Sequence, residues 1–228
     1  MFLETSAFFG VSLSVFAYGI GCLLHKKYKM AIFNPLMIAI IITIVVLAIS
    51  GIDYEIYHAS AQYLSFLLTP ATVCLAVPLY EKLHLLKRDW KAIFVGIGSG
   101  VLIGLSVIFL MCCLFDLSHT EYVTMLPKSI TTPIGMGVCD ELGGYVTLTV
   151  AAIIITGVLG NTFAPFICRV FKIQNPIAKG IAIGTASHAI GTSKAMEMGE
   201  TEGAMGSLSI VVAGTLTVLA APIFARLI

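Results

Sequence analysis

Long runs of apolar residues, separated by short polar segments, dominate this sequence. A helix needs about 20 apolar residues to cross the hydrocarbon core of a lipid bilayer. Runs near that length predict membrane-spanning helices at Leu3–Leu24, Asn34–Ser50, Ala92–Phe115, Leu142–Cys168 and Leu208–Ile228. The pattern therefore predicts an all-α, polytopic helical integral membrane protein.

Three further apolar segments are interrupted by polar residues, proline or glycine: Leu64–Glu81, Leu126–Glu141 and Pro176–Gly199. Non-helical backbone at membrane depth is tolerated where it lines a cavity or is buried in protein. We therefore expect broken or re-entrant elements in these segments. The residues expected to break helices or to allow close packing are Pro70, Pro78, Gly184 and Gly191.

A weak internal similarity links two parts of the chain. Thr69-Pro70 and Thr132-Pro133 each follow an apolar span and an acidic loop. Broken segments in corresponding positions are typical of duplicated transporters, although two such pairs also arise by chance. No flexible linker or shift in composition marks a second domain, so we expect residues 1–228 to form one membrane domain.

The composition supports a membrane location. Hydrophobic residues make up 58% of the chain and charged residues 11%, whereas about a quarter of an average soluble domain is charged. The formal net charge of +1 gives no indication of a nucleic-acid partner. The six cysteines show no metal-site or disulfide spacing, and we expect buried free thiols.

Basic residues gather in three of the loops: Lys26, Lys27, Lys29, Lys82, Lys87, Arg88, Lys91, Arg169, Lys172 and Lys179. The alternate loops, Gly51–Ser60 and Asp116–Glu121, contain no Lys or Arg. The positive-inside rule then predicts a cell (plasma) membrane protein with its N-terminus outside and its basic loops in the cytoplasm. Leu126–Glu141 must begin and end on the outer side. Pro176–Gly199 either dips back or crosses, which leaves the side of the C-terminus open.

The segment from Pro127 to Ile134 carries the first candidate binding chemistry. Pro133 is suited to the first turn of a helix, with Thr131 or Thr132 as its N-cap. A helix start inside a membrane would direct free N–H groups into a cavity, and Lys128 and Ser129 would add a cation and a hydroxyl. The alternative is an interfacial lysine followed by an ordinary capped helix.

The second candidate segment runs from Gly184 to Lys194 and combines small residues with Thr185, Ser187, His188 and Thr192. Close helix packing explains the small residues and hydroxyls. It explains the histidine less well, because burying an ionisable group is costly unless that group is paired or lines water. We expect Thr185, Ser187, His188 and Thr192 to contact a substrate or couple protons. Lys194 and Glu197 lie one turn apart and predict an ion pair, and Glu200 and Glu202 suggest a solvated loop.

Sequence motifs for catalysis are missing from the chain. It has no Gly-rich phosphate loop, no H-E-x-x-H and no nucleophile elbow. We therefore expect a protein that is not an enzyme and has no metal and no cofactor. Transport, gating and scaffolding remain as possible functions.

Several of these stretches together resemble the LrgB/CidB family. The resemblance rests on L-x-P-A-x-V-x-L-A-x-P-L-Y-E at Leu68–Glu81, P-K-S-x-T-T-P-I at Pro127–Ile134, G-T-A-S-H-A-x-G-T at Gly184–Thr192 and E-G-A at Glu202–Ala204. This family includes bacterial antiholin-like proteins and the membrane half of the plastid glycolate/glycerate translocator. Asp140 and Glu141 depart from the expected pattern, which puts carry-over of substrate preference in doubt.

The resemblance implies two possible functions, each with a small LrgA/CidA-like membrane partner. One is transport of small carboxylates such as pyruvate, glycolate or glycerate, and the other is antiholin-like regulation of murein hydrolase activity and cell lysis. Interrupted segments, Lys128 and the hydroxyl clusters favour the carrier, because they suit a short anion bound near the midplane. The coupling ion and a possible homo-oligomer are left open.

Overall fold

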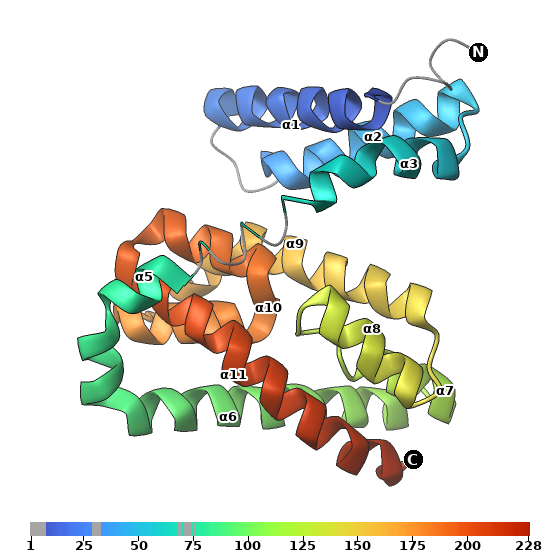
Figure 1. Cartoon of the computed structure of the whole chain (residues 1–228). Coiled ribbons are helices and arrows are strands. Elements are labelled where there is room, and N and C mark those ends of the chain that lie inside the picture. Colours follow the sequence, from blue (N-terminus) through green and yellow to red (C-terminus); the bar gives the residue numbers. More distant parts are fainter. Residues whose placement is uncertain (1–7, 29–32, 68–69, 71–73, 75) are drawn as a thin grey trace. The chain divides into compact units, whose positions relative to one another are not determined.

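The computed structural model describes residues 8–28, 33–67, 70, 74 and 76–228, and the regular secondary structure of these residues is helical (Figure 1). The chain divides into two compact units, Met1–Cys74 and Leu75–Ile228. The expectation of one membrane domain stays a prediction.

The first unit consists of α1 (Phe9–Tyr28), α2 (Pro35–Ser50) and α3 (Tyr54–Ser65), with α1 packed against the other two helices. The Asn34-Pro35 pair begins α2, and the Asn34 Oδ1 atom accepts hydrogen bonds from the next free backbone N–H groups. The Gly10 N–H donates to the Ser60 Oγ atom over 2.7 Å and ties α1 to α3. Of these helices, α1 is long and apolar enough to cross a membrane.

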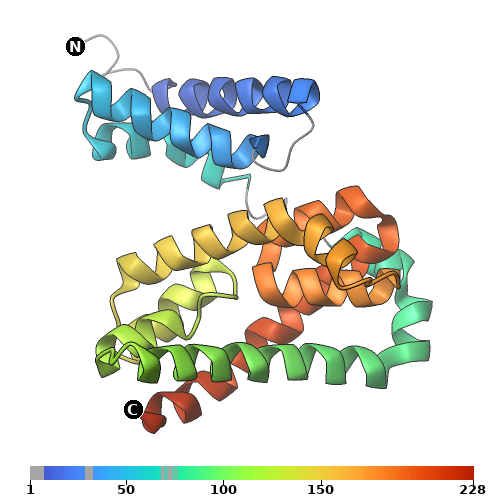
Figure 2. The ribbon, with the colours of Figure 1, turned by 180° about the vertical axis from the view of Figure 1, so that it is seen from behind.

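The second unit is built around α6 (Leu83–Leu114), α9 (Val146–Val170) and α11 (Glu200–Phe224), preceded by the short α5 (Ala76–Glu81). These three long helices also meet the length and hydropathy of membrane spans, so the chain is a multi-pass membrane protein. Figures 1 and 2 show α6 and α9 on two sides of the unit. Pro78 lies in the first turn of α5, where proline is tolerated.

The N-terminus of α11 corrects one expectation. The helix begins at Glu200, not at Leu208, because the acidic residues form its first turn. Glu200 pairs with Lys82 over 3.0 Å, and Glu202 lies 4.0 Å from Lys179. Glu202 is only 8% exposed, so its assignment to a solvated loop was wrong.

The segment after α6 enters and leaves the unit at the same end. A reciprocal capping box between Ser118 and Glu121 begins α7 (His119–Met125), and the hydrogen bonds from the Ser118 hydroxyl and backbone lower the pKa of the Glu121 carboxyl. The chain then turns and returns as α8 (Thr132–Glu141). The Thr124 Oγ1 atom accepts a hydrogen bond from the Tyr145 N–H over 2.8 Å, so the end of α7 and the start of α9 lie together. The segment is re-entrant, as predicted.

The remaining helix, α10 (Pro176–Met198), folds back on itself at Ser187 and His188. Gly180 and Gly184 in its first half lie against Glu202 and Gly206 of α11, and in the second half Thr192 contacts Gly206 again. Along the first half of α10, the contacted residue of α11 therefore moves from Glu202 to Gly206. In the second half, the contacted residue is again Gly206. Of the two alternatives that the sequence left open, α10 dips back and does not cross.

The two re-entrant elements enter the second unit from opposite ends. The α7–α8 element starts beside the C-terminus, where the His119 Nδ1 atom lies 2.9 Å from the Ile228 carbonyl oxygen. At the other end, Lys179 near the start of α10 lies 4.0 Å from Glu202, and Lys82 pairs with Glu200, both in the first turn of α11. One re-entrant element follows α6 and the other follows α9, an arrangement typical of transporters with inverted repeats. The sequence similarity had paired the Thr69-Pro70 segment with the Thr132-Pro133 segment, whereas the structure pairs the α7–α8 element with α10. Thr69 lies outside the described residues.

The cysteines are free thiols in the structure, as expected. Three of them are buried, Cys112, Cys139 and Cys168, whereas Cys22, Cys74 and Cys113 are exposed on the surface of the chain. The expectation of burial was therefore wrong for the second group. An apolar thiol on a membrane-spanning helix can face lipid instead of protein.

Candidate functional site

The tips of the two re-entrant elements meet at Ile153 in the first half of α9. From one side, the His188 Nε2 atom lies 3.0 Å from the Ile153 carbonyl oxygen. From the other, Gly135 in α8 packs directly against the Ile153 side chain. Residues of both re-entrant elements, one at the break in α10 and one in α8, are thus brought to one level of α9.

A cavity of about 960 Å³ lies between α6, the first half of α10, α11 and the turn after α7. Most of its wall is apolar. Its polar lining residues are Arg88, Asp89, Ser99, Lys128, Ser129, Asn175, Thr185 and Thr217. A concave apolar site with a few polar groups is the usual form of a small-molecule site.

Lys128 brings a positive charge to this cavity. Its ammonium group donates a hydrogen bond to the Ser129 Oγ atom over 3.2 Å. None of the ion pairs in the described part of the chain involves Lys128, whereas Arg88 is paired with Asp89 over 2.8 Å. The half-buried Lys128 therefore keeps most of its capacity to bind an anion.

Thr185 supplies the third predicted residue in the cavity wall. Its side chain is 7% exposed, and its Oγ1 atom is buried without a hydrogen-bond partner among the described residues. Its methyl group faces α6 at Gly100, where an added Cβ would lie 2.9 Å away. A buried hydroxyl without a partner costs about 1–3 kcal/mol. The Oγ1 atom is not exposed to the cavity in this rotamer, and a rotation about the Cα–Cβ bond would bring it to a ligand there.

Thr131, Thr132 and Pro133 begin α8 and do not belong to the cavity wall. Thr131 has the extended backbone of an N-cap residue, but its side chain makes no capping hydrogen bond. Thr132 and Pro133 occupy the first turn. Their role as substrate ligands stays a prediction.

The polar residues at the break in α10 are held by protein atoms. Ser187, His188 and Thr192 are 3%, 3% and 0% exposed. The Thr192 Oγ1 atom donates to the His188 carbonyl oxygen over 2.8 Å, and Ser187 packs between Gly160 of α9 and Gly191. These contacts fix the tip of the re-entrant helix, and substrate contact by the three residues stays a prediction.

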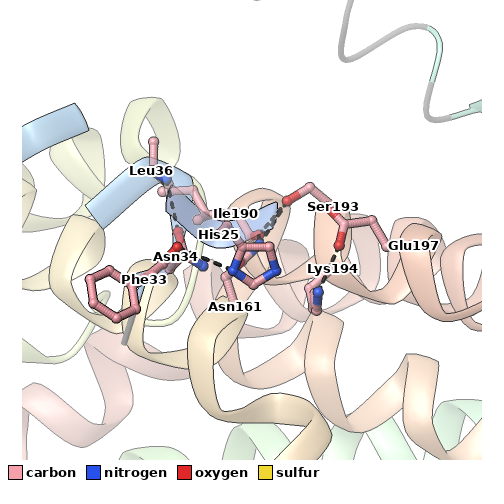
Figure 3. A network of polar contacts seen from close by, with 9 residues as sticks. All are labelled: His25, Phe33, Asn34, Leu36, Asn161, Ile190, Ser193, Lys194 and Glu197. Carbon is pink, nitrogen blue, oxygen red and sulfur yellow. Dashed lines mark hydrogen bonds and ion pairs between the residues drawn. The ribbon is translucent and has the colours of Figure 1, made fainter. Parts of the chain in front are cut away.

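A polar network joins α9 to the second half of α10 (Figure 3). The Asn161 Nδ2 atom donates to the Ile190 carbonyl oxygen over 2.8 Å and to the Ser193 Oγ atom over 2.9 Å. The predicted Lys194–Glu197 ion pair is confirmed at 2.7 Å. The charge of Lys194 is therefore neutralised within its own helix.

Comparisons with known proteins decide the family. The LrgB-like family model matches residues 14–227. Antiholin-like protein LrgB from Bacillus subtilis (strain 168) is 37% identical over 224 residues, which are 98% of this chain and 97% of the relative. The proteins of the same name from Bacillus cereus (strain B4264) and Bacillus anthracis (strain CDC 684 / NRRL 3495) are 36% identical over 218 residues, 95% of each chain. The chain belongs to the LrgB-like family. No solved structure matches it.

The cavity of this LrgB-like chain contains polar residues that sequence reasoning missed, Ser99, Asn175 and Thr217. The sequence did contain a signal that the face of α6 near Ser99 is special. Gly96, Gly100 and Gly104 recur every four residues along α6, and all three line the cavity. A glycine row of this spacing marks a helix face with close packing or open space. Asn175 was hidden in a basic loop, and Thr217 in an uninterrupted apolar run.

Proposed function

We propose that this LrgB-like protein carries small carboxylate anions of the pyruvate, glycolate or glycerate type across a membrane. The observation that carries the proposal is Lys128, a cation without an acidic partner in the described part of the chain, in the wall of a large cavity. A carboxylate leaving water needs a counter-charge and several donors, or the cost of its desolvation is not offset. Lys128 supplies the charge, and the Ser129 and Thr185 hydroxyls supply donors.

The arrangement of the re-entrant elements supports movement of a bound anion. Both tips reach the middle of the second unit, and they enter from opposite ends. In transporters of this design, the substrate site lies between such elements, and access alternates as one part of the protein rocks against the other. Binding and release would need no covalent chemistry, cofactor or metal, so the protein would not be an enzyme.

We further propose that a small LrgA/CidA-like membrane protein completes the functional unit. The resemblance of the sequence to the family motivates this partner. The bilayer would surround both chains, with the N-terminus of this chain outside and its basic loops in the cytoplasm.

Antiholin-like regulation of murein hydrolase activity and cell lysis is the second candidate function. The names of the Bacillus relatives favour it, because each is called an antiholin-like protein and none of these names mentions transport. In that case, the cavity would serve regulation and would not be a transport path.

Uptake into proteoliposomes tests the first function against the second. Purified protein is reconstituted alone and together with the proposed partner, and entry of labelled pyruvate, glycolate and glycerate is measured. We expect saturable uptake that Lys128→Gln abolishes. Lys87→Gln is the control, because Lys87 is exposed and lies outside the cavity wall. No uptake in either preparation, combined with altered lysis in cells that lack the protein, would favour the second function.

A further inference from the structure

The cavity is much larger than the substrates proposed above. Sites of about 300–1,000 Å³ hold drug-sized ligands, and this cavity, at about 960 Å³, lies near the upper end. A two- or three-carbon carboxylate contains only a handful of heavy atoms. Most of the cavity would therefore face another part of a longer ligand.

The charges of the cavity wall are unevenly placed. Arg88 and Asp89 neutralise each other at a kink in α6. From Trp90, just after the kink, to Gly100, which faces Thr185, the helix rises about 15 Å. The segment that carries Lys128 enters from the opposite, C-terminal end of α6, so Lys128 and Thr185 both lie away from Arg88, and the wall between carries Ile93, Ile177 and Ile181. Such a wall offers an apolar chain favourable burial and offers a second carboxylate no counter-charge.

We propose that the cavity also accepts monocarboxylates with an apolar tail longer than two or three carbons, and that it binds these more tightly than the short acids. The carboxylate binds at Lys128, Ser129 and Thr185, and the tail lies along the apolar faces of α6 and α10. This inference rests on the proposed anion site and adds the substrate class. Dicarboxylates are poor ligands, because their second charge would be desolvated against isoleucine and valine side chains.

Equilibrium binding of a homologous series tests the proposal. The complete protein in lipid nanodiscs is titrated with straight-chain carboxylates from acetate to octanoate, and with succinate. Each buried methylene should tighten binding by about fourfold, the equivalent of about 0.8 kcal/mol. Succinate should bind more weakly than butyrate, which has the same number of carbons. Affinity that is flat along the series, as expected if a lipid acyl chain fills the cavity, would overturn the inference but leave the anion site standing. Failure of every carboxylate to bind would remove the proposed function itself.

Partition of longer carboxylates into the bilayer is separated from binding by a cavity-filling variant. Gly96 lines the cavity between Arg88 and Gly100, and a Cβ at this position meets only the Ile181 Cγ2 atom, at 3.6 Å, an ordinary van der Waals distance. Gly96→Leu should therefore fit while shortening the apolar end, and leucine also favours the helix. We expect octanoate to lose at least about tenfold in affinity, the effect of roughly two buried methylenes, whereas propionate changes little.

Gly137→Leu in α8 is the matched control, because this glycine is exposed, a Cβ on it meets no atom within 4 Å, and it lies outside the cavity wall. Ala182→Leu, on the α10 side of the cavity, repeats the test if the first variant does not fold. Equal losses for octanoate and propionate, or no loss for either in both cavity variants, would show that the tail lies elsewhere.

Discussion

Replacing Thr185 by valine should move stability and binding in opposite directions. The two side chains have nearly the same shape, but valine lacks the Oγ1 atom that is buried without a partner in the described structure. An unsatisfied buried hydroxyl costs about 1–3 kcal/mol. Thr185→Val should therefore raise the free energy of unfolding of the ligand-free protein by about this amount, although most buried substitutions destabilise.

The same change should weaken carboxylate binding. A hydrogen bond to a charged group contributes about 1.5–3 kcal/mol, which corresponds to roughly a ten- to hundredfold increase in Kd. The assay combines thermal unfolding in nanodiscs, with and without propionate, and equilibrium titration of the same preparations. The shift of the unfolding midpoint by the ligand should shrink in the variant, while the midpoint without ligand rises.

Two threonines of α9 serve as controls for this experiment. The Oγ1 atom of Thr162 is also buried without a partner among the described residues, but Thr162 lies outside the cavity wall, so Thr162→Val should stabilise without affecting binding. The Oγ1 atom of Thr149 donates to the Thr124 carbonyl oxygen over 2.7 Å, so Thr149→Val should destabilise by about 1 kcal/mol. If Thr185→Val behaves like Thr149→Val, its hydroxyl has a protein partner and the reasoning is wrong.

Three further outcomes are expected. Lys128→Arg should retain only part of the binding, because a planar guanidinium replaces a compact charge; unchanged Kd values in titration would contradict a direct contact. His188→Gly should be about 1 kcal/mol more stable in thermal unfolding than His188→Ala, because both lose the bond to Ile153 but only glycine relieves the positive φ of 44°. Cysteines placed at His119 and Ile228 should react with an impermeant thiol reagent from the same side of the membrane, since the two residues are in contact; labelling from opposite sides would exclude the described path of α11.

The sequence predicted four of the five spans and the broken segments Leu126–Glu141 and Pro176–Gly199, because both kinds of element depend on local composition. The predicted span at Asn34–Ser50 forms the 16-residue α2, which is shorter than a membrane span, and part of Leu64–Glu81 lies outside the described residues. Runs of about 20 apolar residues identify bilayer-crossing helices, and the Asn34-Pro35 start of α2 follows from capping chemistry alone. The boundary of α11 was missed for a tertiary reason. Glu202 looked solvated in the sequence, but the folded-back α10 places the half-buried Lys179 beside it and buries Glu202 within the second unit.

The candidate site was predicted only in part, because polarity in sequence does not tell which side of a helix faces a cavity. Lys128 and Thr185 came from two separate motifs and do share one cavity. Thr217 lies in an apolar run that is typical of a lipid-facing helix. Only the packing of α11 places it in the wall of the cavity. Ser187 turns instead toward Gly160 of α9, which depends on how α10 folds back.

The polar residues of the two motifs differ in whether protein contacts offset the cost of their burial. At the break in α10, His188 and Thr192 each have a hydrogen-bond partner, and those partners explain their presence structurally. Lys128 donates one hydrogen bond, to the Ser129 Oγ atom, but has no acidic partner in the described part of the chain, and the Thr185 hydroxyl is unsatisfied. A lysine at the centre of a bilayer costs about 3 kcal/mol on insertion scales, and the hydroxyl adds about 1–3 kcal/mol. Local costs that the fold does not repay are expected at functional sites. That both fall in the wall of one cavity is the strongest reason to regard this cavity, and not the histidine-containing break, as the anion-binding part of the protein.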